Sequence, residues 1–298
     1  MSTNQHIKLV FPNQITLQMK REDLLHPIIS GNKFRKLKYN LEEAKGQNQN
    51  VLLTFGGAFS NHIVAVAGAG KEFGFKTIGI IRGEELEEKI SENPSLFQAQ
   101  QFGMNLIFIS RAHYRLKENS DFIENLKAEF GDFYLIPEGG TNALAIKGCE
   151  EILSETDSQF THVCSSVGTG GTISGIINSS NSNQNIIGFS SLKGDFLQKD
   201  IAKFANKKNW SVNCDYHFGG YGKVTEELID FINKFNLEHQ ILLDPIYTGK
   251  MMFGILDLIK NNYFPTNSKI LAIHTGGLQG IAGMNLALEK KGKTKISI

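Results

Sequence analysis

The stretch Ser30-Gly31-Asn32-Lys33-Phe34-Arg35-Lys36-Leu37 places one lysine, Lys33, on a Gly-Asn turn where a helical pattern begins. Apolar residues then recur every three or four positions, which predicts an amphipathic helix with one buried stripe, made of Phe34, Leu37, Leu41 and Ala44. The turn fixes the backbone of Lys33, so its amine can point into a cleft. Partial desolvation there would populate the neutral amine that a Schiff-base lysine needs. The alternative, from these residues alone, is a solvated lysine after a turn.

Strand-like and helix-like segments alternate along the rest of the chain. Short apolar segments predict strands at 51–55, 77–81, 105–109, 133–136, 162–165, 186–189, 240–243 and 269–274. Helical patterns are expected at 62–73, 94–102, 121–130 and 142–154. Such alternation predicts an α/β fold, with parallel-rich open sheets covered by helices.

Composition narrows the classes of function. The chain has 298 residues, and its 31 Lys and Arg residues nearly balance 30 Asp and Glu, so neither nucleic acid nor an anionic membrane is an expected partner. The longest apolar run, 63–70, is far shorter than the ~18 residues of a membrane span, and no signal-peptide pattern opens the sequence. Three widely spaced cysteines, Cys149, Cys164 and Cys214, argue against a disulfide framework. We expect a cytoplasmic protein.

Ligands of open α/β sheets bind beyond the carboxyl ends of the strands, which directs attention to the loops at 56–61, 166–172, 247–250 and 275–277. One of them reads Gly168-Thr169-Gly170-Gly171-Thr172, in which converging N–H groups and a helix N-terminus would form a phosphate cradle. A bare glycine turn is the alternative. The loop is not a dinucleotide fingerprint, because Ile173 stands where that pattern needs glycine, and Ala287 likewise breaks the only candidate P-loop.

Other chemistries find little support. The sequence has no H-E-x-x-H, no C-x-x-C and no G-x-S-x-G, so we expect neither a metal centre nor a serine-hydrolase elbow. A turn-held lysine together with a phosphate cradle indicates pyridoxal 5'-phosphate, which needs a Schiff-base amine and a phosphate anchor.

Seven segments, in order across nearly the whole chain, resemble the 1-aminocyclopropane-1-carboxylate deaminase and D-cysteine desulfhydrase family. They are 30–37, 56–62, 137–143, 168–172, 220–222, 244–250 and 274–277. The resemblance implies a two-domain fold-type II architecture like that of tryptophan synthase β. By analogy, the large cofactor-binding domain would be formed by 1–47 and 158–298, and the small domain by 48–157.

The resemblance also implies a role for each matching residue. Lys33 would carry the cofactor, Asn61 would contact its phenolic oxygen and Tyr247 its ring face, while Thr248 and Thr275 would face its pyridine nitrogen. The phosphate would be held by Lys36, Gly168, Thr169, Gly170, Gly171 and Thr172. The substrate carboxylate would be received by Ser60, Asn61 and His62, with Ser60 also a candidate nucleophile or proton shuttle and Tyr221 a second catalytic tyrosine beside Tyr247. Ser30 and Phe59 depart from the family pattern, which bears on the shape of the substrate pocket.

The function that we favour at this stage is β-elimination from a small amino-acid substrate, D-cysteine above all, by a homodimeric enzyme. The alternatives are ring opening of 1-aminocyclopropane-1-carboxylate, replacement chemistry of the cysteine-synthase kind, and a cofactor-binding protein without turnover. Thr248 and Thr275 favour elimination, because a hydroxyl beside the pyridine nitrogen gives a weaker electron sink than a carboxylate does.

Overall fold

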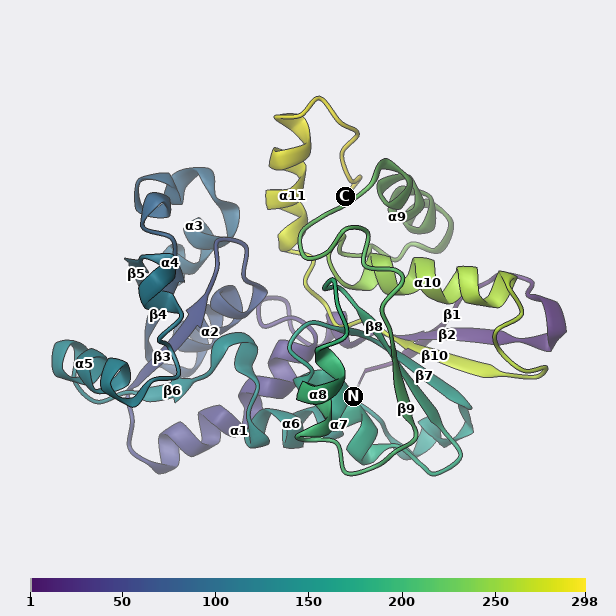
Figure 1. Cartoon of the computed structure of the whole chain (residues 1–298), viewed down its shortest axis with the longest axis horizontal. Helices are drawn as coiled ribbons and strands as arrows, with labels where there is room; N and C mark the ends of the chain where they lie inside the picture. Colours follow the sequence, from purple (N-terminus) through teal and green to yellow (C-terminus); the bar gives the residue numbers. More distant parts are fainter. Residues whose placement is uncertain (1) are drawn as a thin grey trace.

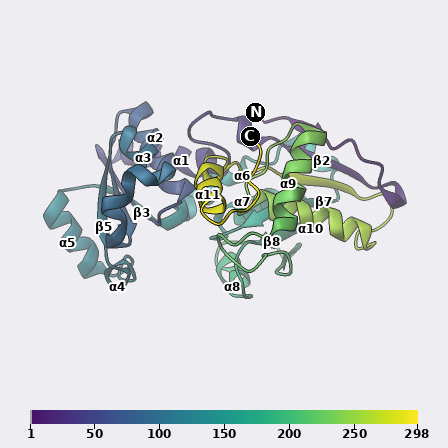
Figure 2. The ribbon, with the colours of Figure 1, turned by 90° about the horizontal axis from the view of Figure 1, so that it is seen from above.

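A computed structural model describes residues 2–298, and its strands form two separate sheets (Figures 1 and 2). The larger sheet has the order β1-β2-β10-β7-β8-β9, and the smaller has the order β5-β4-β3-β6. Helices pack on both sheets, so the predicted α/β fold with parallel-rich sheets is confirmed.

In the larger sheet only β1 and β2 pair antiparallel. Its strands are β1 (Asn4–His6), β2 (Thr16–Lys20), β7 (His162–Val167), β8 (Asn185–Ser190), β9 (Trp210–Asn213) and β10 (Lys269–Ile273). The helices that follow or flank them are α7 (Gly171–Ser179), α8 (Leu197–Ala202), α9 (Glu226–His239), α10 (Thr248–Lys260) and α11 (Gly280–Glu289). Strand β7 is buried along its whole length, as expected for a central parallel strand covered on both faces.

The smaller sheet is entirely parallel. Its strands are β3 (Val51–Gly56), β4 (Lys76–Arg82), β5 (Met104–Ile109) and β6 (Tyr134–Ile136), and its helices are α2 (Asn61–Phe73), α3 (Pro94–Gln101), α4 (Arg111–Tyr114) and α5 (Ser120–Phe130). Helix α2 begins at the N-cap Ser60 and ends at Gly74 in the left-handed region with φ 80°. Five short 3₁₀ segments complete the fold, at Pro12–Gln14, Glu22–Leu24, Glu84–Glu92, Glu138–Gly140 and Glu155–Gln159.

Two helices, α1 (Asn32–Gly46) and α6 (Ala143–Glu150), lie between the two sheets (Figure 1). They approach so closely that a Cβ on Gly148 would lie 2.0 Å from the carbonyl oxygen of Arg35. The predicted stripe of α1 is confirmed at three of its four positions: Leu37, Leu41 and Ala44 are buried in one core with α2 and β3, and Phe34 is half-buried and packs against that core. Cys149 and Ile152 instead pack with β7 and α7, so this end of the predicted segment 48–157 shares a core with the larger sheet.

One predicted strand, 240–243, is wrong. Helix α9 ends at His239, Gln240 takes a left-handed conformation with φ 55°, and the segment that follows is an irregular loop. Ile241 and Leu243 are buried, which explains the apolar pattern, but β10 already pairs with β2 on one side and β7 on the other, so no neighbouring strand is open to them. The sequence analysis also missed β1, β2 and β9.

Candidate active site

A cavity of about 590 Å³ lies where the carboxyl ends of both sheets meet. It is lined from the larger sheet by the loops after β7 and β10, and from the smaller sheet by the loops after β3 and β6 and by the last residue of β4. The lining residues used below are Asn32, Lys33, Lys36, Phe59, Ser60, Asn61, His62, Arg82, Glu138, Ser166, Gly168, Thr169, Gly170, Thr172, Leu192, Tyr221, Tyr247 and Thr275. This position is the one expected for a ligand site in open α/β sheets.

Lys33 and Lys36 lie about one turn apart on α1, and both amines donate to the carbonyl oxygen of Gly139, each at 3.0 Å. Burial, and then the charge of Lys36, lower the pKa of Lys33 well below its usual value. Burial lowers the pKa of Lys36 to about 8. Lys33 is therefore the lysine that loses its proton more readily and supplies the nucleophilic amine, whereas Lys36 keeps its charge near neutral pH.

The turn before α1 holds Lys33 at the cavity. Gly31 has a φ of 61°, and a Cβ there would lie 2.0 Å from the carbonyl oxygen of Thr275. That same oxygen accepts a hydrogen bond from the N–H of Asn32 at 3.1 Å. The turn is thus pressed against the end of β10 in a conformation that glycine adopts without strain.

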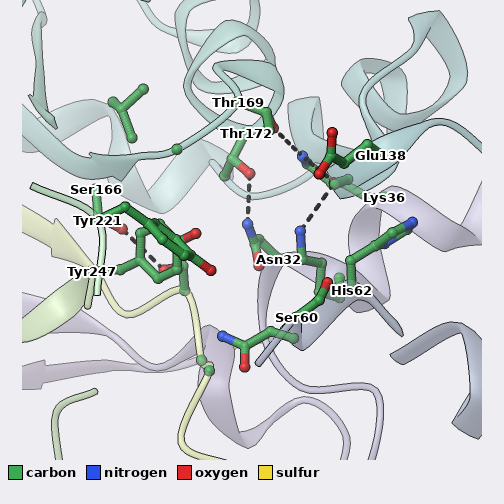
Figure 3. A pocket seen from close by; sticks show the side chains of 18 of the residues that line it. Asn32, Lys36, Ser60, His62, Glu138, Ser166, Thr169, Thr172, Tyr221 and Tyr247 are labelled. Atoms are coloured by element: carbon green, nitrogen blue, oxygen red, sulfur yellow. Dashed lines mark hydrogen bonds between the residues drawn. The ribbon is translucent and has the colours of Figure 1, made fainter. Parts of the chain in front are cut away.

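The glycine loop after β7 forms a small polar hollow beside Lys36 (Figure 3). The amine of Lys36 lies 3.1 Å from Thr141 Oγ1 and 3.5 Å from Thr169 Oγ1. On the other side, Asn32 Nδ2 donates to Thr172 Oγ1 at 2.7 Å. A Cβ on Gly171 would lie 2.8 Å from Thr141 Oγ1, so a side chain there would crowd the hollow. Backbone N–H groups, hydroxyls, a helix N-terminus and a cation together suit a phosphate group.

The N-terminus of α2 forms another wall of the cavity. Ser60 caps this helix, its Oγ accepting from the N–H of Ile63 at 3.3 Å. Asn61 Oδ1 is buried and has no hydrogen-bond partner among residues 2–298, as expected of a side chain that a ligand would complete. Free N–H groups at the start of a helix favour an anion such as a carboxylate.

The ring of His62 is not suited to the carboxylate-binding role that we predicted for it. Its Nε2 lies 2.9 Å from Thr54 Oγ1, which itself donates to the carbonyl oxygen of Ile136 at 2.8 Å. Thr54 must therefore accept from His62, which places the ring proton on Nε2 and leaves a lone pair on Nδ1, which has no hydrogen-bond partner in the part of the chain that the structure describes. Burial lowers the pKa of His62 well below its usual value, so the ring stays neutral. A carboxylate would meet the backbone N–H of His62 instead of the ring.

Tyr247 and Tyr221 lie edge to face, with ring centroids 6.2 Å apart (Figure 3). Burial raises the pKa of both hydroxyls, so both remain protonated donors. Asp244 fixes the turn before α10, of which Tyr247 is the N-cap: the buried carboxylate of Asp244 accepts from the N–H groups of Ile246, Tyr247 and Thr248 at 2.8–2.9 Å.

Thr248 does not face the cavity, contrary to our prediction. Its side chain is fully buried, and its hydroxyl donates to Asp244 Oδ2 at 2.7 Å while accepting from the N–H of Asp244 at 2.9 Å. Thr275 does line the cavity, where its Oγ1 lies 3.2 Å from Ser166 Oγ. The hydroxyls available to a ligand at this end are therefore those of Ser166 and Thr275.

Of the predicted site residues, all but Gly171 and Thr248 line the cavity. Several other residues that line the cavity were not predicted from the sequence, namely Asn32, Arg82, Glu138, Ser166 and Leu192. Asn32 and Ser166 belong to segments that it quoted, and Glu138 lies in the segment 137–143. Arg82 ends β4, and only the carboxyl-end rule for parallel strands could have pointed to it.

Comparison with known proteins places this geometry in a family. The family model described as "Pyridoxal-phosphate dependent enzyme" matches residues 11–276. A putative 1-aminocyclopropane-1-carboxylate deaminase of Pyrococcus horikoshii is 30% identical over 279 residues, covering 88% of this chain and 84% of that protein. The mitochondrial bifunctional D-cysteine desulfhydrase/1-aminocyclopropane-1-carboxylate deaminase of Arabidopsis thaliana is also 30% identical, covering 91% of this chain and 74% of that protein.

A crystal structure of an ACC deaminase homologue superposes with a TM-score of 0.78 at 28% identity, covering 94% of this chain and 90% of that one. The fold agrees with the one that the sequence segments implied. The chain therefore belongs to the pyridoxal-phosphate dependent enzymes, within the group of 1-aminocyclopropane-1-carboxylate deaminases and D-cysteine desulfhydrases.

Proposed function

We propose that this enzyme uses pyridoxal phosphate to eliminate the β-substituent of a small amino acid, and that D-cysteine is a substrate, yielding pyruvate, sulfide and ammonia with consumption of one water. The observation that carries the proposal is the pairing of Lys33 and Lys36: one cavity contains a buried lysine amine with a strongly lowered pKa and, beside it, a second lysine next to a glycine hollow.

The residues present fit this cofactor. The hollow beside Lys36 has the hydrogen-bond donors that a phosphate needs. It has no room for a side chain at position 171, because a Cβ on Gly171 would intrude on it. Asn61, whose Oδ1 has no partner in the described chain, could turn its amide toward the phenolic oxygen. Tyr247 would lie against the ring, and the Ser166–Thr275 hydroxyl pair would meet the pyridine nitrogen. When bound, the cofactor supplies an electron sink that acidifies the substrate Cα–H bond.

Residues of the chain would transfer the protons and hold the substrate. We assign the Cα proton to the neutral amine of Lys33. The N-terminus of α2 at Ser60 would hold the substrate carboxylate, which fixes the Cα–H bond relative to that base. The protonated hydroxyl of Tyr221 would donate toward the departing group.

The second candidate is ring opening of 1-aminocyclopropane-1-carboxylate, which consumes one water and gives 2-oxobutyrate and ammonia. Two of the relatives described above bear this activity in their names, one of them together with D-cysteine desulfhydrase. The hydroxyls of Ser166 and Thr275 support elimination instead, because a hydroxyl beside the pyridine nitrogen gives a weaker electron sink than a carboxylate does.

A keto-acid release screen of the cofactor-loaded enzyme with D- and L-cysteine, 3-chloroalanine, serine and 1-aminocyclopropane-1-carboxylate tests the proposal. We expect pyruvate and sulfide from D-cysteine, faster than 2-oxobutyrate from the cyclic substrate. Borohydride reduction and peptide mapping should locate the cofactor on Lys33, and Lys33→Ala should abolish turnover. Lys45→Ala, an exposed change on the same helix, should not affect turnover. Label on Lys36, or keto acid from none of these compounds, would contradict the proposal.

Three further proposals concern the whole molecule. We propose that the two sheets mark two domains, with the small one near residues 48–157, and that the enzyme is a cytoplasmic homodimer. The two-sheet arrangement supports the division, and the sequence resemblance supports the homodimer. In the part of the chain that the structure describes, no helix is long and apolar enough to cross a membrane. Light scattering of the purified protein tests the dimer.

A further inference from the structure

Phe59 departs from the family pattern and has no assigned role in the proposed reaction, yet it lies at a contact between the two sheets. It belongs to the loop after β3 of the smaller sheet and lines the cavity, with 42% of its surface exposed. A Cβ on Gly283, in α11, would lie 2.7 Å from both Cδ1 and Cε1 of its ring. The ring is therefore seated directly on the backbone of a helix that follows β10 of the larger sheet.

Helix α11 lies where such a contact can join the two parts of the molecule. It follows β10 in the chain but lies between α3 and α9, and it contacts α3, which packs on the smaller sheet (Figures 1 and 2). At the far end of α11, Lys290 Nζ lies 3.7 Å from Glu92 Oε2, an exposed ion pair that contributes little. The contact of Phe59 with Gly283 is apolar and lies at the cavity, so it can hold the two walls together where the ligand binds.

The segment that leads from β10 into α11 touches the start of α2 as well. A Cβ on Gly277 would lie 2.7 Å from Asn61 Nδ2, and Asn61 is the first residue of α2, two residues after Phe59. Thr275, at the beginning of the same segment, lines the cavity beside Ser166. These contacts therefore join the wall assigned to the substrate carboxylate to the wall that carries the hydroxyls of Ser166 and Thr275.

We propose that Phe59 is a positioning residue, which holds the loop after β3 against α11 and so keeps the N-terminus of α2 aligned with the cofactor site before substrate binds. The proposal rests on the proposed lyase function, in which that N-terminus holds the substrate α-carboxylate. If the aligned state becomes only a fraction of the population, the apparent dissociation constant of the substrate rises by the inverse of that fraction. Loss of the ring should therefore raise KM and leave kcat nearly unchanged, because the bound state is the same.

Steady-state kinetics of the cofactor-loaded enzyme test this split. We expect Phe59→Ala to raise KM about 10-fold for D-cysteine and for racemic 3-chloroalanine alike, because a half-buried aromatic contact is lost and both substrates carry the α-carboxylate. For both substrates kcat should stay within about twofold. Phe59→Leu should recover part of the loss. Phe73→Ala, at a similarly exposed aromatic residue that ends α2, should change neither constant.

Gly283→Ala tests the same contact from the side of α11. Alanine is preferred to glycine inside a helix, so this change should be harmless unless the new methyl group meets the ring. We expect KM to rise about 10-fold, because the ring of Phe59 is displaced. In Phe59→Ala/Gly283→Ala the methyl group occupies space that the ring has left, so KM should stay near that of Phe59→Ala alone. Independent effects would multiply to about 100-fold and would overturn the proposal.

Hydrogen exchange of the cofactor-free protein provides a readout that does not depend on turnover. Amides in the first turns of α2 and α11 should exchange about 10-fold faster in Phe59→Ala than in wild type, whereas those of the buried strand β7 should not change. An unchanged KM, or wild-type exchange in both helices, would overturn the proposal. Absence of keto acid from both substrates with wild type would instead refute the lyase function, and the exchange rates would still decide whether Phe59 holds the two walls together.

Discussion

Replacement of Lys250 by methionine should release the loop that carries Tyr221 while leaving the rest of the fold nearly as stable. Lys250 is only 1% exposed, and its Nζ donates to the carbonyl oxygens of His217 at 2.8 Å and Gly220 at 2.9 Å. The loop needs this support, because four of its residues have a positive φ: Phe218, Gly219, Gly220 and Gly222. Lys250 is therefore a positioning residue for Tyr221.

Two opposing contributions determine how much Lys250→Met changes the free energy of unfolding and the stability of the loop. Hydrogen bonds to a charged donor contribute about 1.5–3 kcal/mol each, so the pair holds the loop by at least about 3 kcal/mol. Burial lowers the pKa of Lys250 from 10.5 to about 8, which makes the buried charge cost up to about 3 kcal/mol below pH 8. Methionine removes both terms. The global free energy of unfolding should change by less than about 2 kcal/mol, whereas amides of the loop should exchange roughly 100-fold faster.

The pH dependence gives an independent signature of the same lysine. Between about pH 8 and 10.5 the unfolded chain holds the proton of Lys250 and the folded chain does not, so stability rises with pH across this window. Lys250→Met should lack that share of the rise in urea unfolding of the cofactor-free protein.

Hydrogen exchange followed by mass spectrometry, with Lys260→Met as an exposed control at the other end of α10, measures the loop directly. kcat should fall in Lys250→Met through the misplaced Tyr221. Loop amides that exchange at the wild-type rate, or a variant that unfolds as a whole, would refute the reasoning.

Four other substitutions have defined outcomes. Lys36, with a pKa of about 8, should lose its charge above that pH, so calorimetry should show inorganic phosphate binding to the cofactor-free protein weaken as pH rises, and Lys36→Met should show weak binding at every pH. Gly148→Ala should lower the free energy of unfolding in urea by about 3 kcal/mol, because its Cβ would lie 2.0 Å from a backbone carbonyl of α1. Thr248→Val should lower the free energy of unfolding by about 1–3 kcal/mol in thermal unfolding, because its hydrogen bonds to Asp244 are lost, and should leave substrate preference unchanged. Thr275→Val should instead change the ratio of sulfide release to ring opening.

Features that depend only on residues close together in the chain were predicted correctly from the sequence. The helix after Gly31 and its buried stripe follow from spacing alone, and the glycine segment at Gly168–Thr172 leads into a helix, α7, whose first residue is Gly171. The predicted strand at 240–243 is wrong because strand pairing depends on residues that are far away in the chain. An apolar run reports burial, but whether it pairs as a strand depends on which sheet edges other parts of the chain have left open.

Side-chain partners were harder to predict than elements. Thr248 follows Tyr247 in a loop that reaches the cavity, so the sequence favoured a place beside the ligand. Its hydroxyl instead donates a hydrogen bond to the carboxylate of Asp244, four residues earlier. The signal was present, since a carboxylate just before a helix is an ordinary cap for its first N–H groups. Arg82 had no such signal, because its exposure to the cavity depends on how β4 meets the larger sheet.

Lys33 and Lys36 have different roles, and their spacing in the sequence does not predict which of the two is the reactive lysine. Both follow the same turn, both are on the face of α1 that meets Gly139, and both donate to its carbonyl. Lys36 has two further oxygens, those of Thr141 and Thr169, which help to support a charge in a buried position. Among residues 2–298, Lys33 has the one shared acceptor, and burial, followed by the charge of Lys36, lowers its pKa, so its amine gives up the proton first. The reactive lysine is thus defined by oxygens that the loops after β6 and β7 bring to α1, and these lie more than one hundred residues away in the chain.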